Sequence, residues 1–156
     1  MSHAQVVQRV GDLTIVLWRE PELPAGLPSL IVEAQASGIA WICDFREAWK
    51  TRPYTDTGEA LFLSFDGEKL VAMAVISADP HIERTDTGRL RYIYVAQAAR
   101  GRGLLRVFVE LCLAHGAARW RRFRLHTDNP VAARVYESYG FVATADEVRS
   151  THVREL

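Results

Sequence analysis

The spacing of hydrophobic residues divides the chain into strands, where apolar positions alternate, and helices, where they recur every third or fourth residue. Two hairpins are predicted, because two pairs of apolar runs flank short turns that contain glycine. These are residues 4–10 and 13–18 around Gly11-Asp12, and residues 59–65 and 69–77 around Asp66-Gly67. Residues 71–76 are apolar on both faces, which predicts a central strand. Four further strands are expected at residues 89–95, 123–127, 141–144 and 150–154.

Four helical segments are predicted between these strands, at residues 29–36, 39–51, 103–118 and 130–139. Ser29 can cap the first, and Pro130 suits the first turn of the last. Gly38 and Gly140 fit the left-handed residues that end helices. The segment from residue 103 is apolar almost all round, so we expect it to be buried against the sheet.

Some side chains are assigned to faces by the same periodicity. In the second helix, Trp41, Phe45, Ala48 and Trp49 share one apolar face. The strand near residue 123 alternates apolar Phe123, Leu125 and Thr127 with Arg122, Arg124 and His126, which predicts a half-buried strand. Cys43 and Cys112 both lie in apolar helical patterns, without a metal-binding spacing, so reduced, buried thiols are expected.

The order of elements predicts an α/β (α+β) fold with one main sheet, formed by residues 1–156 as a single domain. An apolar fraction of 49% and a charged fraction of 24% are typical of a soluble globular protein. No apolar run is long enough to span a bilayer, and Met1–Gln5 does not begin a signal peptide. We therefore expect a cytoplasmic protein without a membrane partner.

Charge is distributed unevenly although the chain is neutral overall. Residues 1–83 hold 6 basic and 12 acidic residues, whereas residues 84–124 hold 10 arginines and 2 acids. Overall neutrality argues against general binding of nucleic acid. The basic block favours an anionic ligand, and the acidic N-terminal part is a weaker indication of a cationic one. A solvated arginine surface would explain some of the block equally well.

A strand followed by an Arg/Gly turn and a helix lies at the centre of the basic block. Residues 92–95 read Tyr-Ile-Tyr-Val, and after a short connector residues 100–105 read Arg-Gly-Arg-Gly-Leu-Leu. Glycines allow a ligand to approach the main chain, and the N–H groups at a helix N-terminus attract anions. The stretch therefore predicts a site for a phosphate or pyrophosphate.

Two segments, residues 92–104 and 126–141, resemble consecutive motifs of the GNAT superfamily of N-acetyltransferases. The resemblance implies a mixed, mostly antiparallel sheet flanked by helices, with splayed strands at the site of acetyl-CoA, a co-substrate; it implies no metal. The implied contacts to acetyl-CoA are Ile93, Tyr94, Val95, Arg100, Gly101, Arg102, Gly103, Leu104, Leu105, Asn129 and Tyr136. The Val95 backbone N–H would be the oxyanion donor, and Tyr136 the general acid for the thiolate.

Other readings of these residues stay open, because Asn129 suits a helix cap and Tyr136 suits an ordinary core position. Two positions depart from the family pattern: Leu105 stands where a small residue is common, and Arg89 stands where many members have a glutamate base. The base is therefore unassigned. The candidates are Asp44, Glu47, Asp79, His81, Glu83 and His126.

The predicted function is acyl-CoA-dependent N-acyl transfer, most simply of acetyl, to a primary amine of a small molecule or peptide by direct transfer. Trp41, Trp49 and Tyr54 are candidates for lining the acceptor side. The alternative is a non-catalytic acyl-CoA-binding module for sensing or assembly. A third hypothesis, transfer to a nucleic acid, predicts a steep salt dependence of acceptor binding. A homodimer is compatible with the sequence, which does not determine the oligomeric state.

Overall fold

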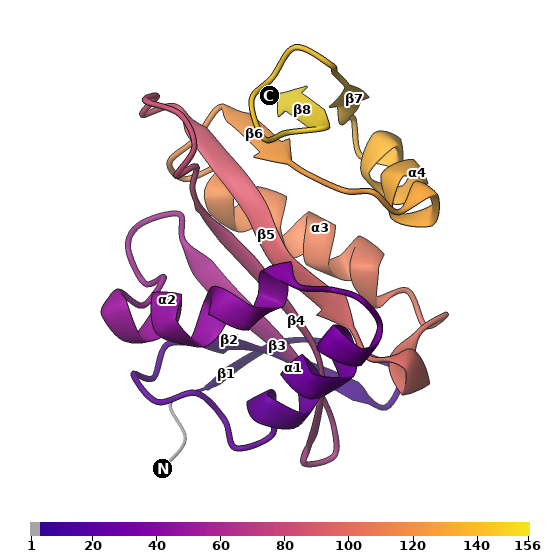
Figure 1. The fold of residues 1–156 in the computed structure, drawn as a ribbon. Helices are drawn as coiled ribbons and strands as arrows, with labels where there is room; N and C mark the ends of the chain where they lie inside the picture. Colours follow the sequence, from indigo (N-terminus) through magenta and orange to yellow (C-terminus); the bar gives the residue numbers. More distant parts are fainter. Residues whose placement is uncertain (1–3) are drawn as a thin grey trace.

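The computed structural model describes residues 4–156, which are organised around a mixed sheet of eight strands (Figure 1). Along the sheet the order is β1-β2-β3-β4-β5-β6-β8-β7. All neighbouring strands are antiparallel except β5 and β6, which are parallel. The strands are β1 (Gln5–Val10), β2 (Leu13–Trp18), β3 (Ala60–Asp66), β4 (Lys69–Ala78), β5 (Thr87–Val95), β6 (Arg122–Leu125), β7 (Val142–Ala143) and β8 (His152–Glu155).

Helices cover both faces of the sheet. They are α1 (Leu27–Ala36), α2 (Phe45–Thr51), α3 (Leu104–Gly116) and α4 (Pro130–Ser138), with short 3₁₀ turns η1 (Trp41–Asp44) and η2 (Gln97–Ala99). Figure 1 shows α1 and α2 in front of the sheet and α3 behind it. Side chains of α3 pack on β4 and β5, and Phe108, Val109 and Cys112 are fully buried. The predicted mixed fold is confirmed.

The second predicted helix is interrupted, and this changes which side chains are buried. Its first turn is the 3₁₀ turn η1, and α2 begins only at Phe45. Because a 3₁₀ turn advances the chain by a different angle from an α-helix, the two parts do not share one face. Trp41 is 48% exposed and Cys43 is exposed, so the prediction of two buried cysteines is wrong for Cys43.

Two further details differ from the sequence prediction. Helix α1 begins at Leu27, with Gly26 at its N-cap and no side-chain capping bond, so Ser29 lies inside the helix rather than at its start. Strand β6 is buried throughout, including Arg122 and Arg124, so the predicted half-buried alternation is wrong. The two arginines are buried because carboxylates lie beside them, as described below.

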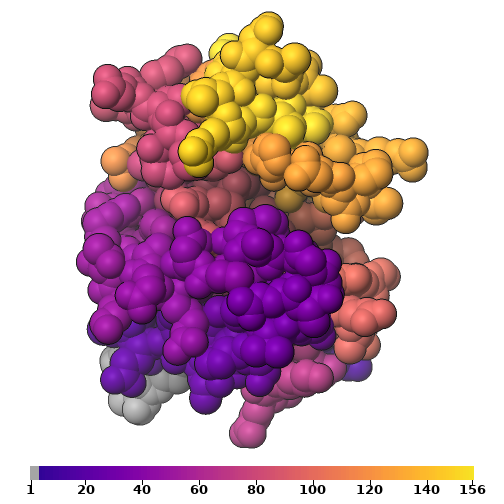
Figure 2. Space-filling view, in the orientation of Figure 1, coloured from indigo at the N-terminus to yellow at the C-terminus, as the bar shows by residue number. Residues whose placement is uncertain are grey.

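The surface reflects this layout. In the space-filling view, the N-terminal helices and the C-terminal strands stand out as two masses, with residues of β5 and α3 lying deeper between them (Figure 2). Strand β5 therefore runs between the two halves of the molecule, next to the turn that precedes α3. None of the helices in the described part of the chain is long and apolar enough to cross a membrane.

Candidate active site

Strand β5 is paired on both sides only in its first part. Thr87, Gly88 and Arg89 pair with β6, whereas residues 90–95 have no partner there. The other edge of β5 stays paired with β4 as far as Val95. The two parallel strands therefore diverge after Arg89, which leaves one edge of β5 free to accept a ligand as an added strand.

A β-bulge lies at the start of this unpaired part. Val75 of β4 pairs with Arg91, and Met73 pairs with Tyr94, so one residue of β4 faces two residues of β5. Tyr92 has a φ of +52°, which is uncommon for a residue other than glycine. Its ring packs on Phe45 with a centroid distance of 5.1 Å. The bulge changes the register of β5 and so determines which backbone groups face the free edge.

The Val95 backbone faces that free edge. Ala96 N donates to Val71 O at 2.7 Å, and Val95 lies opposite Ala72. Opposite residues of an antiparallel pair alternate between hydrogen-bonded and non-hydrogen-bonded positions, so Val95 occupies a non-hydrogen-bonded one. Its N–H and C=O consequently point away from β4. This is the orientation that an oxyanion donor at Val95 requires.

The Arg/Gly turn before α3 is open to a ligand. Gly101 and Gly103 have φ values of +79° and +82°, and a Cβ atom added to either would meet no other atom within 4 Å. Arg102 is exposed, and Leu104 is buried. Leu105 packs partly against the core instead of facing the turn. The turn thus presents backbone N–H groups at the N-terminus of α3, where a pyrophosphate is favoured.

Arg100 joins the turn to the end of β5. Its Nε donates to Val95 O at 3.1 Å, and its guanidinium lies 5.8 Å from the centre of the Tyr94 ring. The Tyr94 hydroxyl donates to Glu33 Oε2 at 2.6 Å, and Gln97 N donates to the same oxygen at 3.2 Å. Glu33 of α1 therefore fixes both the strand end and the connector. Sequence reasoning missed Glu33, because its partners are more than 60 positions away.

Helix α4 carries the other two predicted site residues. Asn129 caps the helix, since its Oδ1 accepts from Val131 N at 2.9 Å and from Ala132 N at 3.2 Å. This use of Oδ1 leaves the Asn129 amide N–H₂ group for a ligand. Tyr136 is buried, with its ring 6.0 Å from that of Phe141. Burial, with a smaller effect of Cys112, raises the pKa of the Tyr136 phenol. Within residues 4–156 the Tyr136 hydroxyl forms no hydrogen bond, so a neutral phenolic donor lies without a protein partner.

Of the six candidate bases, Asp44, Glu47 and Glu83 are exposed, and the other three have different surroundings. Asp79 is buried with its Oδ2 3.4 Å from both Arg89 Nη1 and Arg124 Nη1, so it serves as their counter-ion. His126 is half exposed beside Asp128. Half-buried His81 follows Asp79, whose Oδ1 accepts from His81 N at 2.9 Å. Burial, and then the positive charge of Arg89, lower the pKa of His81, so its imidazole is neutral at pH 7.

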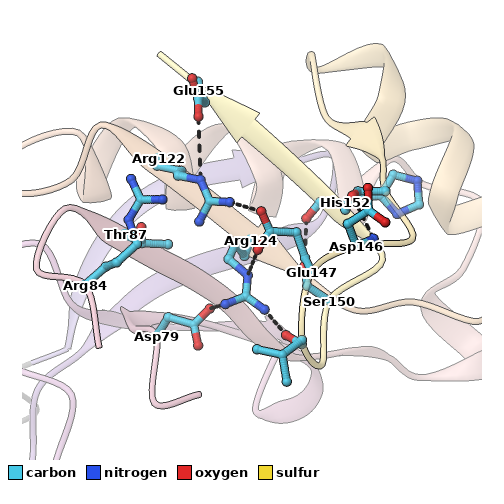
Figure 3. Close-up of polar contacts among 12 residues, drawn as sticks. Asp79, Arg84, Thr87, Arg122, Arg124, Asp146, Glu147, Ser150, His152 and Glu155 are labelled. Carbon is cyan, nitrogen blue, oxygen red and sulfur yellow. Dashed lines mark hydrogen bonds and ion pairs between the residues drawn. The ribbon is translucent and has the colours of Figure 1, made fainter. Parts of the chain in front are cut away.

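A buried cluster of charges lies where β5 and β6 are still paired (Figure 3). Arg124 is completely buried, and besides Asp79 it contacts Glu147 and the Val148 carbonyl oxygen. Arg122 pairs with Glu147 and, at 3.6 Å, with Glu155. Arg89 donates to Arg149 O at 2.6 Å. Arg89 therefore belongs to a structural cluster and cannot replace the missing glutamate base.

The sequence and the fold of this chain resemble those of acetyltransferases. The model of the acetyltransferase (GNAT) family matches residues 31–141. A provisionally assigned acetyltransferase from Exiguobacterium sp. 255-15 has a TM-score of 0.80 at 19% identity, over 92% of this chain and 93% of that one. An acetyltransferase from Streptococcus agalactiae 2603 has a TM-score of 0.72 at 19% identity, over 93% and 99%. The same search finds yncA, a provisionally assigned acetyltransferase from Salmonella typhimurium solved with acetyl-CoA, with a TM-score of 0.71 at 17% identity, over 93% and 94%.

The solved structures share the fold of this chain. The family match covers most of the chain, including β5, the Arg/Gly turn and α4. The chain belongs to the acetyltransferase (GNAT) family. A search of curated proteins gives no match.

Proposed function

We propose that the protein transfers an acetyl group directly from acetyl-CoA to a primary amine of a small molecule or peptide. The proposal is based on the free edge of β5, where the Val95 backbone lies next to the open Arg/Gly turn. Residues 93–95 would pair with the pantetheine arm, and residues 100–105 would hold the pyrophosphate. Bound acetyl-CoA supplies the activated acetyl group.

Two groups of the chain would act on the reacting atoms in this proposal, and the base that accepts the amine's proton is left unassigned. The Val95 N–H donates a hydrogen bond to the carbonyl oxygen of the thioester. The Tyr136 phenol, which is protonated at neutral pH, donates its proton to the leaving thiolate.

The proposal is tested by measuring release of CoA from acetyl-CoA across a panel of amines. Tyr136→Phe should lower kcat about 100-fold while acetyl-CoA still binds, because only the phenolic proton is removed. Tyr139→Phe is the matched control, since Tyr139 caps the C-terminus of the same helix and its hydroxyl bonds to Glu110.

A non-catalytic acyl-CoA-binding module is the second candidate, because Arg89 replaces the family's glutamate and is held in the buried cluster. Tight binding of acetyl-CoA without CoA release on any amine would favour the module and contradict the transferase. Equal turnover by Tyr136→Phe and the unmodified protein would remove Tyr136 from the mechanism.

A further inference from the structure

A hollow of about 350 Å³ lies beside the bulge of β5. Arg52 and Tyr54, which follow α2, form one wall, and Asp79 and Pro80 at the end of β4 form another. Arg91, the last residue of β5 before the bulge, completes it. A volume of this size suits a small molecule, and hollows of this kind commonly hold a few polar groups that fix orientation.

The charged groups of the hollow are balanced except for one. Arg52 is neutralised by Glu59, with contacts of 2.7 Å and 2.8 Å to the two carboxylate oxygens. Asp79 is neutralised by Arg89 and Arg124 of the buried cluster. Arg91 forms no ion pair with any carboxylate of residues 4–156. The hollow therefore carries a net positive charge located on the Arg91 guanidinium.

Arg91 is held by aromatic rings, which leaves its hydrogen-bond donors free. Its guanidinium lies 4.7 Å from the centre of the Tyr92 ring and 5.8 Å from that of Tyr54. One Nη donates to the Tyr92 hydroxyl at 3.1 Å. A guanidinium has five N–H donors, so most of them have no acceptor within the described residues. The contacts to the two rings and to the Tyr92 hydroxyl restrain the guanidinium, and a planar fork is suited to bind a carboxylate through two hydrogen bonds.

We propose that Arg91 binds the carboxylate of the acceptor, so that the acceptor is a small amino carboxylate such as a free amino acid. The Tyr54 hydroxyl lines the same hollow and can donate to the same carboxylate. Burial raises the pKa of Tyr54, so it remains a neutral donor at pH 7. This inference rests on the proposed function and specifies its acceptor. It differs from the cationic acceptor that the acidic N-terminal part of the sequence suggested.

The position of Arg91 along β5 agrees with a compact acceptor. Val95 lies four positions after Arg91, which is about 13 Å along an extended strand and less across a bulge. The arginine side chain and the thioester each occupy part of that distance. The acceptor must span the rest of the distance between Arg91 and Val95. Its carboxylate and its amine are therefore a few ångströms apart, as they are in an amino acid.

The test compares amino acids with the matching amines that lack the carboxylate, such as phenylalanine with phenethylamine, by kcat/KM for CoA release. The unmodified protein should prefer the amino acid, and Arg91→Gln should lower kcat/KM for it by about 10- to 100-fold, as expected for loss of a charged hydrogen bond. The rate with the plain amine should change little. Arg91→Lys should restore part of the preference, because it restores the charge without the planar fork.

A control variant and a binding measurement make the outcomes separable. Arg46→Gln removes an exposed arginine of α2 that does not line the hollow, and it should leave the preference unchanged. Equal use of amino acids and plain amines, or an unaltered preference in Arg91→Gln, overturns the inference and leaves the proposed function intact. If no amine is acetylated, the proposed function fails. The inference then fails too unless amino acids shift the NMR signal of Arg91 Nε–H.

Discussion

Two groups of arginines lie on or next to β5 and β6, and they differ in their partners. Where the strands are paired, Arg89, Arg122 and Arg124 are buried and contact Asp79, Glu147 or Glu155. Arg91, where the strands have diverged, and Arg100 and Arg102, in the turn after β5, form no ion pair with a carboxylate of residues 4–156. The arginines of the first group are neutralised by carboxylates within the fold, whereas those of the second group are available to bind anions.

The comparison shows why a count of arginines does not locate a ligand site. A buried arginine that loses its counter-ion is an uncompensated charge in a medium of low polarity, so its pair is part of the fold. An accessible arginine without a counter-ion has donors that only a ligand or water can satisfy. Burial and pairing together, rather than the density of positive charge, separate the structural arginines from the candidate binding ones.

The largest effect should come from breaking the buried cluster at Asp79. Asp79→Ala leaves Arg89 and Arg124 without their shared carboxylate, which should lower the free energy of unfolding by about 3–5 kcal/mol. Urea denaturation measures the change. Asp56→Ala is the control, because Asp56 forms an ion pair with Arg52 but its side chain is 68% exposed. Its effect should stay within about 1 kcal/mol. Equal effects of the two substitutions would mean that the cluster is not structural.

A substitution in the open turn should affect ligand binding more specifically. Gly103→Val introduces a Cβ where the pyrophosphate is proposed to approach, and Gly67→Val introduces one in the β3–β4 turn. Both glycines have positive φ values, +82° and +60°, so both variants should lose about 1–3 kcal/mol through backbone strain. Acetyl-CoA at 100 times its Kd should stabilise the unmodified protein and Gly67→Val by about 2.7 kcal/mol. Thermal unfolding of Gly103→Val should be insensitive to acetyl-CoA. If acetyl-CoA stabilised this variant as much as the unmodified protein, the phosphates would bind elsewhere.

A smaller effect is expected for an exposed arginine of the turn. Arg102→Gln should weaken acetyl-CoA binding by about 10-fold in dilute salt, through loss of a charged contact to phosphate, and less at high ionic strength. Arg121→Gln removes an exposed arginine of the same basic block, beside β6, and should leave the Kd unchanged. Isothermal titration measures both. Equal weakening by the two variants would indicate a general effect of charge.

The smallest effect concerns the pair of Arg52 and Glu59 and appears only in acid. Burial raises the pKa of Glu59, but the hydrogen bonds from Arg52 reverse this, so the pKa lies below its usual value. A carboxyl with a lowered folded pKa contributes stability above its unfolded pKa of about 4.3, which is lost as pH falls through the folded pKa. Glu59→Gln should therefore make the unfolding free energy less dependent on pH below about 4.5. An unchanged pH dependence would show that the pair contributes nothing.

Much of the fold could be predicted because local signals were strong and agreed with each other. Glycine turns located both hairpins; the second turn is displaced by one residue, since Asp66 pairs with Lys69. The apolar composition of residues 104–113 indicated a buried helix, and α3 is one. Asn129 and Pro130 indicated the start of α4, and Asn129 is its cap. The residues of the Arg/Gly turn could be named because their spacing is local.

The remainder depends on contacts between distant parts of the chain. Nothing in the alternation around Phe123 reveals that Arg124 is buried, because its carboxylate Asp79 lies on another strand end. In the sequence, Glu33 is simply one polar residue of a helix, and only the fold shows that it bonds to Tyr94. The distinction between Arg89 and Arg91 is likewise invisible in sequence, since it arises from the point at which β5 and β6 diverge.

The most direct test of the account is a titration of ¹⁵N-labelled protein with acetyl-CoA, followed by the backbone amide signals. The account predicts the largest shifts at Val95, Gly101 and Gly103, on the free edge of β5 and in the turn before α3. The amides of Phe123 and Arg124, in the paired part of the sheet, should move little. Saturation without shifts at Val95 and the two glycines, or with the main shifts at β6, would contradict the proposed acetyl-CoA site.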